Sequence, residues 1–236
     1  MRKLLIAVLI GLILVVPVWA ARPLSTDDAG TLGQGAWEIE EGYELDQPSG
    51  GGASSGGFGT SVKYGVLSNF DLGIEVPYSA AAPVEIGDAT VKGKLAFNDA
   101  VALGIDVKLT NADAASGLGS GYVDYGVNGI YSQGLGNATG HINVGYTIIG
   151  QAGGAAPDNN VLSYGAAVEY PLNDTANLMG EIAGSSTPSA ATNPLDALVG
   201  LNWGMSDLLT LDGGISFGLS DASSQYKAAA GATMAF

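Results

Sequence analysis

The sequence has 236 residues, with 23 acidic against 8 basic side chains and a formal net charge of −15. A chain this acidic repels nucleic acid, and the lack of cysteine excludes a disulfide framework and thiolate metal sites. Its 37 glycines and 47% hydrophobic residues make it too apolar for an intrinsically disordered protein.

Residues 1–20 have the pattern of a cleavable export signal. Arg2 and Lys3 provide a basic start, residues 4–16 are apolar and uncharged, and Ala20 ends a small-residue cleavage site. The apolar run is shorter than the roughly 20 residues of a membrane-spanning helix, which favours cleavage after Ala20. Cleavage removes two basic residues and changes the net charge from −15 to −17.

Residues 21–35 precede the first regular segment and are too polar to cross a membrane. Two structures remain open for them. They can fold into the following domain as a small plug, with Asp27 and Asp28 meeting lysines inside it, or form a loosely docked tail.

Residues 36–236 are predicted to form β-strands, because apolar side chains recur at every second position. Between 101 and 109, for example, every odd position is Val, Leu or Ile, while Asp106 and Lys108 stand between them. Each segment has close to the roughly 9–11 residues that a tilted strand needs to cross a bilayer. The twelve predicted strands are 36–46, 57–67, 70–79, 88–97, 100–110, 120–133, 139–150, 160–172, 175–185, 194–204, 207–219 and 225–236.

Short and long connections alternate along the chain. The short ones are 68–69, 98–99, 134–137, 173–174 and 205–206. The long ones are 46–56, 79–87, 111–119, 151–159, 185–192 and 220–224. This alternation is typical of an all-β, transmembrane, antiparallel up-and-down barrel of about twelve strands, with short periplasmic turns and both termini in the periplasm.

The two faces of the strands differ in chemistry. Large aromatic residues stand on the apolar face near strand ends, whereas Gly and Ala recur on the polar face. In a membrane barrel the apolar face meets lipid and the polar face lines the lumen. A soluble lipocalin-like barrel, with its apolar face inward, is the alternative that periodicity alone leaves open.

The proposed lumen lining contains the five lysines after the signal, the single histidine and eight acids: Lys63, Asp71, Glu75, Lys92, Lys94, Asp106, Lys108, Asp124, His141, Glu169, Glu181, Asp196, Asp212 and Lys227. Glu38, Glu40 and Glu44 share this face, which gives the lining a formal charge of −6 and predicts a preference for cations. In the alternative, the lysines at 63, 92, 94 and 108 pair with the acids at 71, 75 and 106 and fill the lumen with salt bridges.

Glu41 is the exception to this segregation, because its parity places it on the lipid face. A carboxylate is costly there, so we expect a local register shift in the first strand.

The last strand ends on Phe236, with Tyr226, Ala228, Ala230, Ala232 and Met234 on the same face. This pattern resembles the C-terminal strand by which the outer-membrane assembly machinery recognises barrels. The resemblance implies an outer-membrane location, with lipid, lipopolysaccharide and the assembly machinery as partners.

Enzymatic chemistry is not expected. The only histidine, His141, lies on the lumenal face, and no serine shares that face of its strand. A lipid-splitting triad would need Ser, His and an acid together on the lipid face. One histidine and no cysteine also predict no transition-metal site and no cofactor.

A family resemblance is carried by residues 22–31, by Gly33 and Gly35, by Glu38 and Glu40, and by Gly42-Tyr43-Glu44. This stretch resembles the outer-membrane transporters named for the meta-pathway of phenol degradation. The resemblance implies transport of small molecules, apolar or aromatic compounds among them, and carries over no binding residues.

The sequence thus predicts an outer-membrane channel for passive passage of a small solute. The alternative is a non-conducting structural or adhesive barrel that acts through its outer loops. Those loops are rich in Gly and Ser and poor in the aromatic residues that dominate protein-binding surfaces, which favours the channel.

Overall fold

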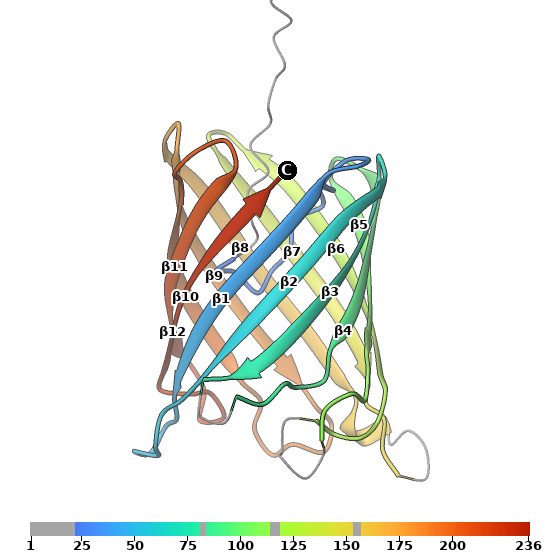
Figure 1. Cartoon of the computed structure of the whole chain (residues 1–236). Coiled ribbons are helices and arrows are strands. Elements are labelled where there is room, and N and C mark those ends of the chain that lie inside the picture. The colour runs from blue at the N-terminus through green and yellow to red at the C-terminus, as the bar shows by residue number, and fades with distance from the viewer. Residues whose placement is uncertain (1–21, 81–83, 114–118, 153–156) are drawn as a thin grey trace, which may run out of the picture.

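The computed structural model describes residues 22–80, 84–113, 119–152 and 157–236, so the predicted export signal lies outside the described residues. Twelve antiparallel strands close into one barrel, with β1 paired to β12 (Figure 1). The strands are β1 (Trp37–Gln47), β2 (Ser55–Leu67), β3 (Phe70–Ser79), β4 (Thr90–Asn98), β5 (Val101–Lys108), β6 (Asp124–Leu135), β7 (Ala138–Ile148), β8 (Val161–Asn173), β9 (Ala176–Ser186), β10 (Leu195–Gly204), β11 (Leu209–Gly218) and β12 (Tyr226–Ala235).

The predicted strands and their order are confirmed, and each boundary lies within four residues of its expected position. The short connections and the C-terminus lie at one end of the barrel, here called the turn end (Figure 1). The long connections lie at the other, the loop end. One of them holds a short 3-10 helix, Pro157–Asn159, that alternation did not predict. No helix in the described part of the chain has the length and apolarity to span a membrane.

On β7, burial separates the two faces of the strand as expected for a membrane barrel. On β7, His141 and Asn143 are only 5% and 6% exposed, while Ile142 and Val144 are 52% and 54% exposed. The interior is therefore polar and the outer wall apolar, which is the reverse of a soluble barrel. This inversion excludes the lipocalin-like alternative.

The predicted register shift at Glu41 is wrong. β1 pairs without a bulge with both of its neighbours from Glu38 to Asp46, so Glu41 stays on the outer face. Its carboxylate accepts hydrogen bonds from the Thr60 and Tyr78 hydroxyl groups on β2 and β3. Cross-strand hydroxyl groups thus satisfy the carboxylate, and the strand does not need to turn it inward.

Candidate functional site: the lumen and its N-terminal segment

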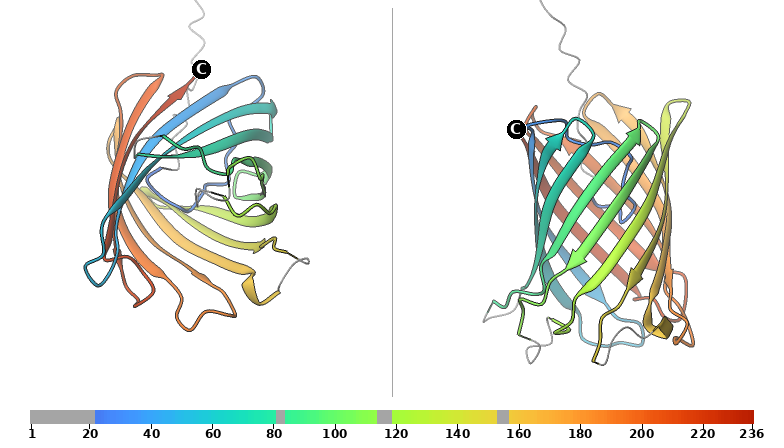
Figure 2. Two further views of the ribbon diagram at one scale, coloured as in Figure 1. Left: turned by 60° about the horizontal axis from the view of Figure 1, so that its bottom comes forward. Right: turned by 90° about the vertical axis from the view of Figure 1, so that its right-hand side faces the viewer.

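Residues 22–34 lie inside the barrel, in the half nearer the turn end (Figure 2). Glu181 on β9 holds the start of this segment. Its carboxylate accepts hydrogen bonds from the Ser25 amide at 3.1 Å, the Ser25 hydroxyl at 2.9 Å and the Thr26 amide at 2.6 Å. Leu24 is buried nearby against Ala167 and Met179. A backbone in a polar lumen is thus anchored by one carboxylate and a small apolar patch.

The middle of the segment binds the opposite wall. The Asp27 amide donates to Asn143 Oδ1 at 2.8 Å, and Asn143 Nδ2 donates back to the Asp27 carbonyl at 2.8 Å. Lys94 Nζ lies 3.1 Å from the Asp27 carboxylate. Burial raises the pKa of that carboxyl, but the ammonium groups of Lys94 and Lys63 lower it more, so the pKa falls below its ordinary value of 3.8.

The end of the segment follows the wall out to β1. The Ala29 amide donates to Ser132 Oγ at 2.9 Å, and the Leu32 amide donates to the Asp71 carboxylate at 3.0 Å. The Gly35 amide then donates to the Gly65 carbonyl at 2.7 Å. Contacts to the wall therefore continue along the whole segment, from its first described residues to the first strand.

Glycines on the lumenal face make room for the segment. A Cβ atom on Gly42 would lie 1.9 Å from the Arg22 guanidinium, and one on Gly200 would lie 2.5 Å from Pro23 Cγ. A Cβ atom on Gly165 would lie 2.6 Å from the Thr26 hydroxyl. Real Cβ atoms do not approach other atoms this closely. The small residues that the alternation placed inside the barrel thus form a track that fits residues 22–26.

Four of the five predicted lumenal lysines are ion-paired. Lys63 Nζ lies 2.8 Å from Glu38 and 3.1 Å from Glu40, and Lys94 binds Asp27 of the segment. Two further ion pairs each join neighbouring strands: Lys92 on β4 with Glu75 on β3 at 2.6 Å, and Lys108 on β5 with Asp124 on β6 at 2.6 Å. Only the Lys92 pair uses one of the three acids of the salt-bridge alternative, because register and the N-terminal segment select the other partners.

Six of the remaining predicted lining residues fall into two groups. Asp71, Glu181 and Asp212 face the N-terminal segment, with Arg22 Nε 3.7 Å from Asp212. Asp106, Asp196 and Lys227 line a cavity instead and make no hydrogen bond or ion pair with any other described residue.

Three side chains form a row beside the segment: the predicted lining residues His141 and Glu169, and Ser132, which the sequence analysis did not single out. His141 Nδ1 lies 2.9 Å from Ser132 Oγ, and its Nε2 lies 3.6 Å from Glu169 Oε1. The sequence missed Ser132 because it stands on β6, directly opposite His141 in the β6–β7 pairing, and that register is a tertiary property. The amide of the fully buried Ala29 donates to that hydroxyl, so Ser132 is the member of the row that holds the segment.

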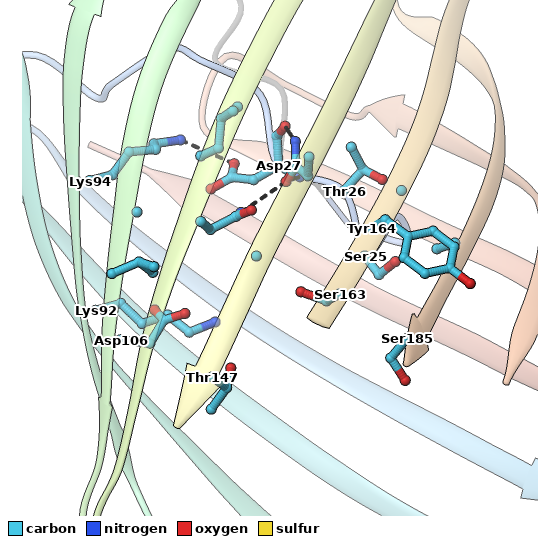
Figure 3. A pocket seen from close by; sticks show the side chains of 18 of the residues that line it. Ser25, Thr26, Asp27, Lys92, Lys94, Asp106, Thr147, Ser163, Tyr164 and Ser185 are labelled. Carbon is cyan, nitrogen blue, oxygen red and sulfur yellow. Dashed lines mark hydrogen bonds and ion pairs between the residues drawn. The ribbon is translucent and has the colours of Figure 1, made fainter. Parts of the chain in front are cut away.

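A cavity of about 520 Å³ lies in the lumen beside the segment, and Ser25, Thr26 and Asp27 form part of its wall (Figure 3). Its charged lining is balanced, with four lysines and four aspartates: Lys63, Lys92, Lys94, Lys227, Asp27, Asp71, Asp106 and Asp196. Lumenal glycines widen it. In the described residues, no group of three His, Cys, Asp or Glu side chains is placed to hold a metal ion.

Comparison with known proteins shows the fold alone. No family model matches the sequence, and no curated protein is similar to it. The structure is similar to the COG4313 outer membrane channel from Pseudomonas putida F1, with a TM-score of 0.66 and 13% identity over 89% of this chain and 98% of that one. It is also similar to the NanC porin, with a TM-score of 0.58 and 13% identity over 84% and 98%.

A third similar structure is the CymD monoaromatic hydrocarbon channel, with a TM-score of 0.53 and 8% identity over 86% of this chain and 89% of that one. By name, the first is an outer-membrane channel, the second a porin and the third a hydrocarbon channel, so the chain shares the barrel fold of such channels. The narrower resemblance to transporters of the phenol meta-pathway stays a prediction.

Proposed function

We propose that this chain is an outer-membrane channel through which small solutes diffuse, and that residues 22–34 form a plug in its lumen. The observation that carries the proposal is a space inside the barrel that is large enough for a small solute: a cavity of about 520 Å³ beside the docked segment, enclosed by a wall whose outer face is apolar. A barrel that served only as a scaffold has no need for such a space.

In this proposal the turn end faces the periplasm and the loop end faces the outside, as short and long connections do in bacterial outer-membrane barrels. The acids on the lumenal face outnumber the lysines, which favours passage of cations because an apolar wall focuses the field of the lining charges. The plug narrows the periplasmic half, so solute flux depends on how firmly it is docked.

The experiment is single-channel recording of the refolded protein in a planar bilayer under a potassium chloride gradient. We expect discrete current steps with a cation-selective reversal potential, and a larger current for Glu181→Ala, which removes the anchor of the plug. An anion-selective reversal potential would still support a channel, but it would contradict the proposal that acidic side chains set its selectivity.

A non-conducting barrel is the second candidate, favoured by the segment and the ion pairs that occupy the turn-end half. Absence of current from a demonstrably folded barrel, in both the parent and the Glu181→Ala variant, would make this the better explanation.

A further inference from the structure

One wall of the cavity carries an arc of polar side chains, of which Asp106 faces the Lys92 ammonium group across the β4–β5 pairing. The arc runs through Asp106, Thr147, Ser163 and Ser185, which Figure 3 labels, and ends at Asp196; all five line the cavity. These five residues, here called the polar arc, come from β5, β7, β8, β9 and β10. None of their side chains makes a hydrogen bond or ion pair with another described residue. The arc therefore presents free hydrogen-bonding groups to whatever fills the cavity.

Strand register makes the arc continuous. Ser163 is directly opposite Ser185 in the β8–β9 pairing. Asp106 and Thr147 are both opposite Gly126 on β6, one from each side. A Cβ atom on Gly126 would lie 3.4 Å from the Thr147 hydroxyl and 3.6 Å from Asp106 Oδ2, so the missing side chain leaves both groups open to the cavity.

The chemistry of the arc matches a ligand with many hydroxyl groups. Two carboxylates accept hydrogen bonds, and three hydroxyl groups between them can donate or accept. Apolar surface also lines the cavity, contributed mainly by Val127, Ile130, Tyr164, Ala183 and Pro194. Polar and apolar groups contribute nearly equally to the lining, so this cavity is more polar than the mostly apolar pockets of most small-molecule sites.

The charge and size of the cavity further restrict the class of ligand that would fit it. The four lysines and four aspartates of the lining cancel, so the cavity as a whole selects neither sign. Its volume of about 520 Å³ lies within the roughly 300–1,000 Å³ of small-molecule sites. A phenol or hydrocarbon would leave the carboxylates and hydroxyl groups dehydrated and unpaired, which is costly.

We propose that this cavity is a binding site for a neutral, hydroxyl-rich solute of mono- or disaccharide size. The proposal rests on the channel function and names its class of solute. It differs from the apolar or aromatic solute that the family resemblance implied, because the hydroxyl groups and carboxylates of the polar arc make no hydrogen bond with another described residue and would find partners in a hydroxyl-rich solute.

The test is equilibrium binding of maltose to the refolded barrel, measured by titration calorimetry in a detergent that has no sugar headgroup. We expect saturable binding that weakens about threefold to tenfold when Thr147→Val removes one hydroxyl group. Asp196→Asn should weaken it as well.

Thr139→Val is the matched control. It makes the same change on the same face of the same strand, but Thr139 lies at the turn end, outside the cavity lining. This variant should bind maltose like the parent.

Three outcomes separate the inference from the proposed function. Ion current together with no maltose binding would overturn the inference and leave the channel intact. Maltose binding that depends on Thr147 in a barrel without current would support the site and reject the channel. Saturable binding of phenol with no binding of maltose would overturn the inference in favour of an aromatic solute.

Discussion

The anchoring role of Glu181 gives the sharpest prediction about the plug. Glu181 is 7% exposed and accepts three hydrogen bonds from Ser25 and Thr26. After a discount for water in the lumen, each of these bonds contributes about 1 kcal/mol. Glu181→Ala should therefore destabilise docking by about 3 kcal/mol and raise the undocked population about a hundredfold.

The assay uses the absence of cysteine in the natural sequence. Ala29 is fully buried against Ala102 and Ile130, so a single Ala29→Cys thiol reacts with a water-soluble maleimide only when the segment leaves the wall. We expect Glu181→Ala to accelerate labelling of Ala29→Cys about a hundredfold. Both proteins carry the same cysteine, so any effect of that substitution cancels.

Glu169→Ala is the matched control, because Glu169 is a lumenal acid on the adjacent strand that makes no hydrogen bond to the described segment. Its effect on the labelling rate should be much smaller. Labelling of Ala29→Cys in the parent as fast as that of an exposed loop thiol would refute docking. Equal rates with and without Glu181 would show that its hydrogen bonds do not hold the segment.

Three further predictions concern single contacts. Because docking lowers the pKa of Asp27 below 3.8, its ion pair stabilises docking fully above that pH and is lost as the pH falls through the lowered pKa; the labelling rate of Ala29→Cys, divided by that of an exposed loop thiol at the same pH, should rise in acid, and Asp27→Asn should reduce that rise. Gly200→Ala places a Cβ atom 2.5 Å from Pro23 and should release the segment while the urea midpoint of the barrel stays within error. Tyr78→Phe removes one partner of the outer-face Glu41 and should lower the free energy of unfolding by about 1–3 kcal/mol in the same urea titration, and an unchanged midpoint would contradict that contact.

Local patterns were sufficient for the barrel itself. Strand positions follow from alternation because a strand that crosses a bilayer presents apolar side chains to lipid and polar side chains to the lumen at alternate positions. This pattern can be read directly from the sequence. The same alternation predicted which charged residues share the lumenal face, and it placed Glu41 on the outer face, where the unbroken register of β1 keeps it. The expectation that the strand would bulge there failed because the Thr60 and Tyr78 hydroxyl groups that satisfy the carboxylate come from two other strands.

Only the tertiary structure decided which lumenal groups meet. Lys63 binds Glu38 and Glu40, and His141 meets Ser132, because pairing register fixes which residues on neighbouring strands stand opposite one another. Residues 22–34 have no periodic pattern, so their place in the lumen depends on groups scattered from β1 to β11. Alternation assigns each side chain to one face of its strand, but closure of the barrel determines which side chains become its neighbours. Those neighbours form the cavity and the contacts that hold residues 22–34.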